Sequence, residues 1–218
     1  MKEKIEQHSR NYWNKTWGKF IKFNGIIAPS AKLLQHLVHN LVRGGIVLDI
    51  GCGEGRNSLY LSRVGFNVIS IDLSIEAVRA TKQNFFSEDL RGLSMGGDSR
   101  YLPLANESVD GILAHHVFDH MDGESFRLST NEASRVLKQN GVMLITMDTF
   151  ATASTDPNTV VKDDGTVVFV SGANKGMLVR PYIESEIQNY VHNGWEILKD
   201  ELTPKRSKIL LLRKVGVV

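Results

Sequence analysis

Two aspartates that end apolar runs flank a glycine-rich turn, and they carry the clearest chemical signal in the chain. An apolar run over residues 46–48 leads to Asp49, and a second run ends at Asp72. The turn after Asp49 contains Gly51, Gly53 and Gly55. Glycine lets the chain turn sharply and lets a ligand approach the backbone. An acid about 20 residues past the first glycine can accept both hydroxyls of a ribose, so the unit predicts a nucleoside-like ligand.

The glycine spacing argues against a dinucleotide. A dinucleotide fold reads GxGxxG, and here the third glycine would fall at position 56, which is Arg56. Asp49 also lies directly before the first glycine, where its charge would repel a pyrophosphate. A cation that carries an ammonium and a sulfonium would tolerate this acid, and S-adenosylmethionine is such a ligand.

Apolar periodicity places these residues in an alternating series of strands and helices. Strands are expected over residues 46–50, 66–71, 93–97, 109–115 and 142–148, and helices over 56–64, 74–86 and 124–138. Such alternation predicts a parallel sheet with helices on both faces. The runs 195–202 and 207–214 are close enough in sequence to form an antiparallel hairpin at the sheet edge.

The two ends of the chain follow other patterns. Residues 3–24 are typical of an amphipathic helix with an aromatic face, and a second helix, with Ser30 as its N-cap, runs to about residue 42. After residue 150 turn signals predominate, with a small strand expected over 167–170 and a helix over 184–193.

These motifs resemble those of the class I S-adenosylmethionine-dependent methyltransferases, especially the small-molecule branch. Gly97-Asp98-Ser99 resembles the acid after the third strand, and the run from Glu132 to Gly141 resembles the helix before the fifth. The similarity covers roughly residues 40 to 150. It implies an α/β, Rossmann-like seven-stranded sheet, mostly parallel with an antiparallel C-terminal hairpin and helices on both faces. It also implies S-adenosyl-L-methionine as cofactor and S-adenosyl-L-homocysteine as product.

The resemblance implies one methyltransferase domain over residues 1–218. Residues 1–42 would form an N-terminal helical lid, 43–150 the cofactor-binding core, and 151–218 an acceptor-side insertion with the terminal hairpin. The aromatic helix could instead simply dock on the sheet, since aromatic stripes are usually packing.

By resemblance, Asp72 accepts the ribose hydroxyls, Asp98 accepts the adenine amino group, and the amide of Ser99 contacts a ring nitrogen. Asp49 would orient the glycine loop or reach the methionine ammonium through water. Arg10 and Arg56 are candidates for the cofactor carboxylate, and Cys52 is expected to be a small loop residue without chemistry. The expected cofactor-binding residues are Asp49, Gly51, Cys52, Gly53, Arg56, Asp72, Leu73, Asp98, Ser99 and His115.

The segment after the fourth strand, residues 114–121, is where methyl acceptors meet the cofactor in this fold. His116 and His120 are the expected catalytic residues, because a neutral imidazole can take a proton from an acceptor hydroxyl or amine. Alternatively, they are hydrogen-bonded structural parts of the loop. A metal site could use them with Asp119 or Asp122, but the spacing matches no specific metal pattern, so no metal is expected. The expected substrate-binding residues are Tyr12, Trp13, Trp17, Arg180 and Tyr182.

Missing motifs narrow the acceptor. Base-modifying amino methyltransferases resemble one another in an Asn/Asp-Pro-Pro-aromatic motif, where this chain reads AHHVFDH. Cytosine C5 and arsenite methyltransferases use cysteines that this chain lacks, since Cys52 is its single cysteine. We expect in-line methyl transfer to a small molecule with an O, N, S or C nucleophile, or to a protein side chain. The alternatives are a non-catalytic S-adenosylmethionine-binding module and a nicotinamide-dependent oxidoreductase.

The composition is that of an ordinary globular domain. The 218 residues are 42% hydrophobic and 23% charged, and a net charge of +2 gives no argument for a nucleic-acid surface. No apolar stretch reaches the length of a membrane span, and the N-terminus lacks a signal-peptide apolar region. A single cysteine excludes an internal disulfide and fits the reducing cytoplasm in which we expect the protein.

Overall fold

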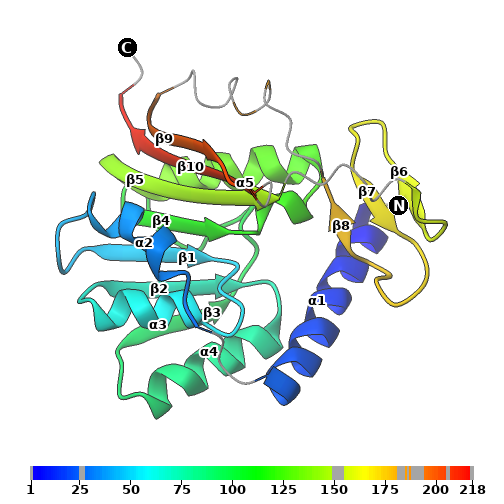
Figure 1. Ribbon diagram of the computed structural model, residues 1–218, viewed down its shortest axis with the longest axis horizontal. Helices are drawn as coiled ribbons and strands as arrows, with labels where there is room; N and C mark the ends of the chain where they lie inside the picture. The colour runs from blue at the N-terminus through cyan, green and yellow to red at the C-terminus, as the bar shows by residue number, and fades with distance from the viewer. Residues whose placement is uncertain are drawn as a thin grey trace.

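The computed structural model describes residues 2–24, 28–148, 155–180, 185, 187, 194–204 and 207–216. It is built around a seven-stranded sheet of order β3-β2-β1-β4-β5-β10-β9 (Figure 1). The five parallel strands are β1 (Ile46–Ile50), β2 (Asn67–Asp72), β3 (Gly92–Gly96), β4 (Val109–His115) and β5 (Leu137–Asp148). The hairpin of β9 (Trp195–Leu202) and β10 (Ser207–Lys214) adds β10 antiparallel to β5. The predicted fold class is confirmed.

Helices cover both faces of the sheet, because the central strands β1, β2, β4 and β5 are apolar on both sides. Successive side chains of a strand point to opposite faces, so Val47 packs in one buried cluster and Leu48 in the other. The first cluster includes residues of α2 (Ala31–Val38), α3 (Arg56–Arg63) and α4 (Ile75–Ser87). The second includes residues of α5 (Gly123–Val136) and of the short 3₁₀ helix η1 (Phe118–His120).

Two elements stand beyond the carboxyl ends of the parallel strands, α1 (Lys2–Asn24) and a small antiparallel sheet (Figure 1). That sheet consists of β6 (Thr159–Val161), β7 (Val167–Phe169) and β8 (Leu178–Val179). On α1, Asn14 Oδ1 accepts from the Ser74 hydroxyl and the Ile75 N–H at the start of α4, both at 2.9 Å. The Tyr12 hydroxyl donates to Met177 Sδ at 3.1 Å, just before β8. Thus α1 connects α4 to the small sheet.

Most predicted elements lie within a few residues of their observed bounds, and the differences have local causes. Ser30 occupies the N-cap position of α2, but its hydroxyl makes no capping bond and lies 3.2 Å from His115 Nε2 instead. β5 begins at Leu137, directly after α5, rather than at residue 142. The helix expected over 184–193 lies largely outside the described residues. The division into lid, core and acceptor-side parts stays a prediction.

None of the helices in the described part of the chain is both long and apolar enough to cross a membrane.

Candidate cofactor and acceptor site

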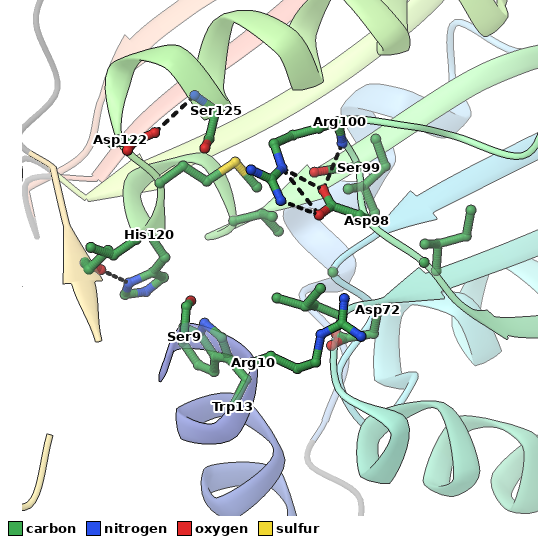
Figure 2. A pocket seen from close by; sticks show the side chains of 18 of the residues that line it. Ser9, Arg10, Trp13, Asp72, Asp98, Ser99, Arg100, His120, Asp122 and Ser125 are labelled. Carbon is green, nitrogen blue, oxygen red and sulfur yellow. Dashed lines mark hydrogen bonds and ion pairs between the residues drawn. The ribbon is translucent and has the colours of Figure 1, made fainter. Parts of the chain in front are cut away.

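A cavity of about 680 Å³ lies at the carboxyl ends of β1, β2 and β4. In the sheet order β1 lies between β2 and β4, the point where chain connections switch direction and where ligands of open α/β sheets bind. The volume is in the range of small-molecule sites, roughly 300–1,000 Å³. Figure 2 shows side chains that line it from α1, from the strand ends and from the segment leading into α5.

The glycine loop after β1 is held by Asp72. Asp72 Oδ2 accepts the Gly53 N–H at 2.9 Å, and Oδ1 accepts the Ser74 N–H at 2.8 Å. Gly51 and Gly53 have φ angles of +67° and +58°, a region that side chains rarely adopt. Burial raises the pKa of Asp72 to about 6, although the bonds from Ser74 and Gly53 oppose this. Ser74 caps α4, as its hydroxyl accepts the Ala77 N–H.

Asp49 lies beneath the loop rather than in the cavity wall. It is 2% exposed, and its Oδ2 accepts from the Ser58 hydroxyl at 2.5 Å, which in turn accepts from Ser70 at 2.8 Å. Burial raises the pKa of Asp49 to about 7. This position favours the loop-orienting alternative over a direct ligand contact. Cys52 is likewise buried, with Sγ 3.6 Å from Thr81 Oγ1, and burial raises its thiol pKa.

Asp98 and Ser99 line the cavity after β3, as expected, but Asp98 has a partner that the sequence reasoning missed. The guanidinium of Arg100 reaches both carboxylate oxygens, with Nη2 2.6 Å from Oδ2 and Nε 3.0 Å from Oδ1. Burial alone would raise the pKa of Asp98, but the bonds from Arg100 outweigh it and lower that pKa. The signal for this pair was a cation two residues after the acid in the same loop.

The two adjacent histidines after β4 have different surroundings. Both ring nitrogens of His115 face hydroxyls, with Nδ1 2.6 Å from Thr146 Oγ1 and Nε2 3.2 Å from Ser30 Oγ. Burial lowers the pKa of His115 to about 3, and its neighbours His116 and Arg56 add to this. His115 is not among the residues that line the cavity, whereas His116 is.

His116 sits between two carboxylates. Its Nδ1 is 3.5 Å from Asp148 Oδ1 and 3.7 Å from Asp119 Oδ2. Its φ angle is +53°, rare for a residue with a side chain. Burial lowers the pKa of His116, but Asp119 and Asp148 outweigh it and raise that pKa.

His120 faces the cavity with a defined tautomer. Its Nδ1 lies 2.9 Å from the backbone carbonyl of Leu178 in β8, a bond drawn in Figure 2. Since a carbonyl only accepts, Nδ1 carries a proton, so the lone pair of the neutral ring is on Nε2. The ring packs edge-to-face against Trp13, with 4.9 Å between centroids.

The remaining predicted residues divide between the cavity and its surroundings. Trp13, Trp17 and Leu73 line it, as does Arg10, whose side chain extends from α1 toward Asp72 (Figure 2). Four others do not line it: Gly53, Arg56, Tyr12, whose hydroxyl bonds Met177, and Arg180, whose Nε lies 3.9 Å from Asp164 Oδ2. Tyr182 lies outside the described residues.

An ion pair that involves Lys162, just after β6, also reaches the cavity and was not predicted. Lys162 Nζ donates to Asp122 Oδ2 at 2.7 Å, and both residues line the cavity. Burial would raise the pKa of Asp122, but the bonds from Lys162 and Ser125 outweigh it and lower the pKa to about 2. No sequence motif marked Lys162, because it lies in an irregular segment 40 residues away.

The cavity residues fit S-adenosylmethionine. Asp72 accepts backbone N–H groups of Gly53, Ser74 and Leu73, and a carboxylate offers about four lone-pair sites, so room remains for a ribose hydroxyl. A Cβ at Gly51 would come within 2.4 Å of Val117, which keeps this backbone bare beside the cavity. Arg10 supplies a cation suited to a carboxylate.

Comparisons with known proteins point the same way. Residues 48–145 match a family model described as a methyltransferase domain. The ribosomal RNA small subunit methyltransferase C of Alcanivorax borkumensis is 35% identical over 118 residues, 52% of this chain and 36% of that protein. The malonyl-(acyl-carrier protein) O-methyltransferase of Yersinia pestis is 29% identical over 133 residues, 58% of this chain and 47% of that protein. The chain therefore spans less than half the length of these curated relatives.

A solved structure matches over nearly the whole chain. It is an S-adenosylmethionine-dependent methyltransferase from Clostridium acetobutylicum, with a TM-score of 0.69 and 20% identity, covering 94% of this chain and 99% of that one. At this identity the likeness establishes the fold. The relatives together differ in their named acceptors.

Proposed function

We propose that this chain, which belongs to the class I S-adenosylmethionine-dependent methyltransferases, transfers a methyl group to a small-molecule nucleophile that carries a proton. The observation that carries the proposal is one cavity lined by both Asp72 and His120. Asp72 is suited to the ribose of the cofactor, and His120 to a proton on the acceptor. The sulfonium of the bound cofactor supplies an electrophilic methyl group, so the protein mainly has to align the acceptor.

His120 is the favoured proton acceptor. Its Nδ1 lies 2.9 Å from the Leu178 carbonyl oxygen and donates to it, so in the neutral ring Nε2 is free to act as the base. Packing against Trp13 orients the ring. His116 lines the same cavity, but its Nδ1 points toward Asp119 and Asp148, so we do not assign it the role of proton acceptor.

The walls of the cavity favour a small acceptor. Trp13 and Trp17 come from α1, and Leu178 comes from the small sheet, so elements far apart in sequence form its walls. Walls on several sides orient an acceptor for attack on the methyl group. The relatives' named acceptors, ribosomal RNA and a malonyl group on a carrier protein, leave the attacking atom open.

The test is turnover of methyl-labelled cofactor against a panel of hydroxyl, carboxyl, amine and thiol metabolites. With an acceptor in hand, His120→Asn should lower kcat by roughly 10²–10⁴-fold, while calorimetric affinity for S-adenosylmethionine stays within about twofold. His39→Asn, at an exposed histidine after α2, is the matched control and should keep full activity.

The outcomes separate the alternatives. Binding of S-adenosylmethionine without turnover on any acceptor would favour the non-catalytic binding module. Tight binding of NAD in its place would favour the oxidoreductase. Full activity in His120→Asn would remove His120 from the mechanism and leave the methyl transfer standing.

A further inference from the structure

We propose that His116, Asp119 and Asp148 bind one divalent transition-metal cation in the wall of the cavity. Each side chain offers one ligand atom, and these atoms lie within 4.8 Å of one another. His116 Nδ1 is 3.5 Å from Asp148 Oδ1 and 3.7 Å from Asp119 Oδ2, longer than the roughly 2.7–3.2 Å of an ordinary N–H···O bond. The imidazole and the two carboxylates therefore face one another at ion-pair distances, and the ring nitrogen has no well-formed hydrogen bond.

A second observation, independent of the clustering, concerns polar atoms that lack partners. Within the described part of the chain, His116 Nδ1 and Asp119 Oδ1 are buried and have no hydrogen-bond partner. Asp119 is only 2% exposed, so water does not readily replace the missing bond. An unpartnered buried polar group costs about 1–3 kcal/mol, more when it is charged. A cation bound between the three side chains would satisfy both atoms at once.

The three side chains are held by rigid elements, as a metal site requires. His116 directly follows β4, and its N–H donates to the Thr146 carbonyl of β5 at 3.1 Å. Asp119 belongs to η1, and its Oδ2 accepts the N–H of Asp148 at 3.1 Å. Asp148 ends β5, where its Oδ1 accepts from the Ser207 hydroxyl at 2.6 Å. The left-handed φ of His116 is a strain of the kind that concentrates at functional sites.

The ligand set indicates the class of cation. One imidazole nitrogen with two carboxylate oxygens is a mixed set, intermediate between the all-oxygen sites of Mg²⁺ and the thiolate sites of structural zinc. Mn²⁺, Fe²⁺ and Co²⁺ accept such sets. Two carboxylates balance the charge of a divalent ion. Three protein ligands leave positions open; among the three residues His116 lines the cavity and Asp119 and Asp148 do not, so an acceptor would reach an open position from the His116 side.

Binding of the cation rests on this geometry alone, whereas its task rests on the proposed methyl transfer. The cation would hold an acceptor oxygen as a Lewis acid and stabilise its anionic form. The O–H proton would pass to His120 Nε2, the oxygen would bond the methyl carbon, and the C–S electron pair would return to sulfur. His116 and His120 then divide the chemistry between a ligand and a base.

Binding is measured without turnover. The full chain is stripped with a chelator, dialysed and titrated with Mn²⁺, and free Mn²⁺ is followed by its electron paramagnetic resonance signal. We expect one Mn²⁺ per chain. Asp119→Asn and His116→Asn should each weaken binding by at least about tenfold. Asparagine tolerates the left-handed φ at position 116. Asp163→Asn, at an exposed acid in the turn before β7, is the matched control and should bind as the wild type does.

Thermal melts confirm that each variant is folded, and His116→Asn carries the test if Asp119→Asn does not fold. Wild-type protein that binds no Mn²⁺ at millimolar concentration would overturn the site, as would equal affinity in His116→Asn. Methyl transfer by protein that binds no Mn²⁺ would reject the metal and keep the proposed function. Site-dependent Mn²⁺ binding without turnover on any acceptor would do the reverse.

Discussion

The guanidinium of Arg100 and the carboxylate of Asp98 form a two-point ion pair inside the cavity, with Nη2 2.6 Å from Oδ2 and Nε 3.0 Å from Oδ1. The backbone N–H of Arg100 also donates to Asp98 Oδ1, at 3.0 Å. Charge-assisted bonds of this kind are strong. The family resemblance assigns the same carboxylate to the adenine amino group, so arginine and adenine compete for its lone pairs.

Removal of the competitor should strengthen cofactor binding. Arg100→Met is expected to raise the affinity for S-adenosylmethionine by about three- to tenfold, since roughly 1 kcal/mol of competing interaction is lost. Calorimetry measures this, with Arg127→Met at an exposed position of α5 as the control. Weaker binding in Arg100→Met would mean that Arg100 itself contacts the cofactor.

Asp72 should be the strongest single determinant of affinity. Asp72→Ala is expected to weaken S-adenosylmethionine binding by about 1–3 kcal/mol, the cost of lost polar contacts. The substitution also leaves the N–H groups of Gly53 and Ser74 without the carboxylate to which they donate, so the melting temperature should fall too. Calorimetry and thermal melts report the two effects separately. An unchanged affinity would contradict the ribose assignment.

Cofactor affinity should depend on pH through the same carboxyl. Burial raises the pKa of Asp72 to about 6 from its ordinary 3.8, so the group gains a proton as the pH falls through 6. Ribose hydroxyls donate best to the ionised form, so affinity should drop roughly tenfold between pH 7 and pH 5. In Asp72→Asn the same titration should be nearly flat. An equal loss of affinity in Asp72→Asn would show that another titrating group causes the pH dependence.

The ends of the central strands could be predicted from the sequence, because buried strands appear as short runs of apolar residues whose limits can be recognised. Asp72 ends an apolar run, His116 follows one, and Asp98 comes two residues after β3; parallel strands bring such positions to one edge of the sheet. The glycine loop could be predicted for a similar reason, since glycine adopts the left-handed φ angles of Gly51 and Gly53 more readily than residues with a side chain do.

Contacts between distant segments could not be predicted in this way. The Leu178 carbonyl next to His120 Nδ1 lies 58 residues from it, in the short strand β8, which no strong sequence pattern marks. The meeting of Asp119 and Asp148 at His116 depends on how η1 packs on the end of β5. The direction of each side chain decides which residues line the cavity, and the sequence does not give it for adjacent residues of α1. Trp13 lines the cavity, whereas the hydroxyl of Tyr12 donates to Met177.

The glycine loop and α1 should be coupled through one steric contact. A Cβ at Gly53 would lie 2.5 Å from Trp17 Cη2, and the φ of +58° adds backbone strain. Gly53→Ala is expected to cost about 1–3 kcal/mol of unfolding free energy. Trp17→Leu should recover part of this loss, because it removes the clash but not the strain. Urea denaturation of the single and double variants forms the cycle. Strict additivity would contradict the contact.

The buried Asp49 should make the fold less stable as the pH rises. Burial raises its pKa to about 7 in the folded chain, against an ordinary value of 3.8. The folded state therefore holds this proton more tightly than the unfolded state. Its stabilising contribution is complete below pH 3.8 and is lost as the pH rises through 7.

Asp49→Asn keeps the shape of the side chain and an oxygen that can accept from Ser58, but it cannot ionise. The unfolding free energy of the wild type should lose about 2 kcal/mol more than that of the variant between pH 5 and pH 8. Urea denaturation of both proteins at both pH values measures this difference. The contributions of the other titrating groups cancel, because the two proteins share them. Parallel slopes in wild type and Asp49→Asn would show that Asp49 stays ionised inside the fold, and Ser58 and Ser70 would then have to stabilise its charge.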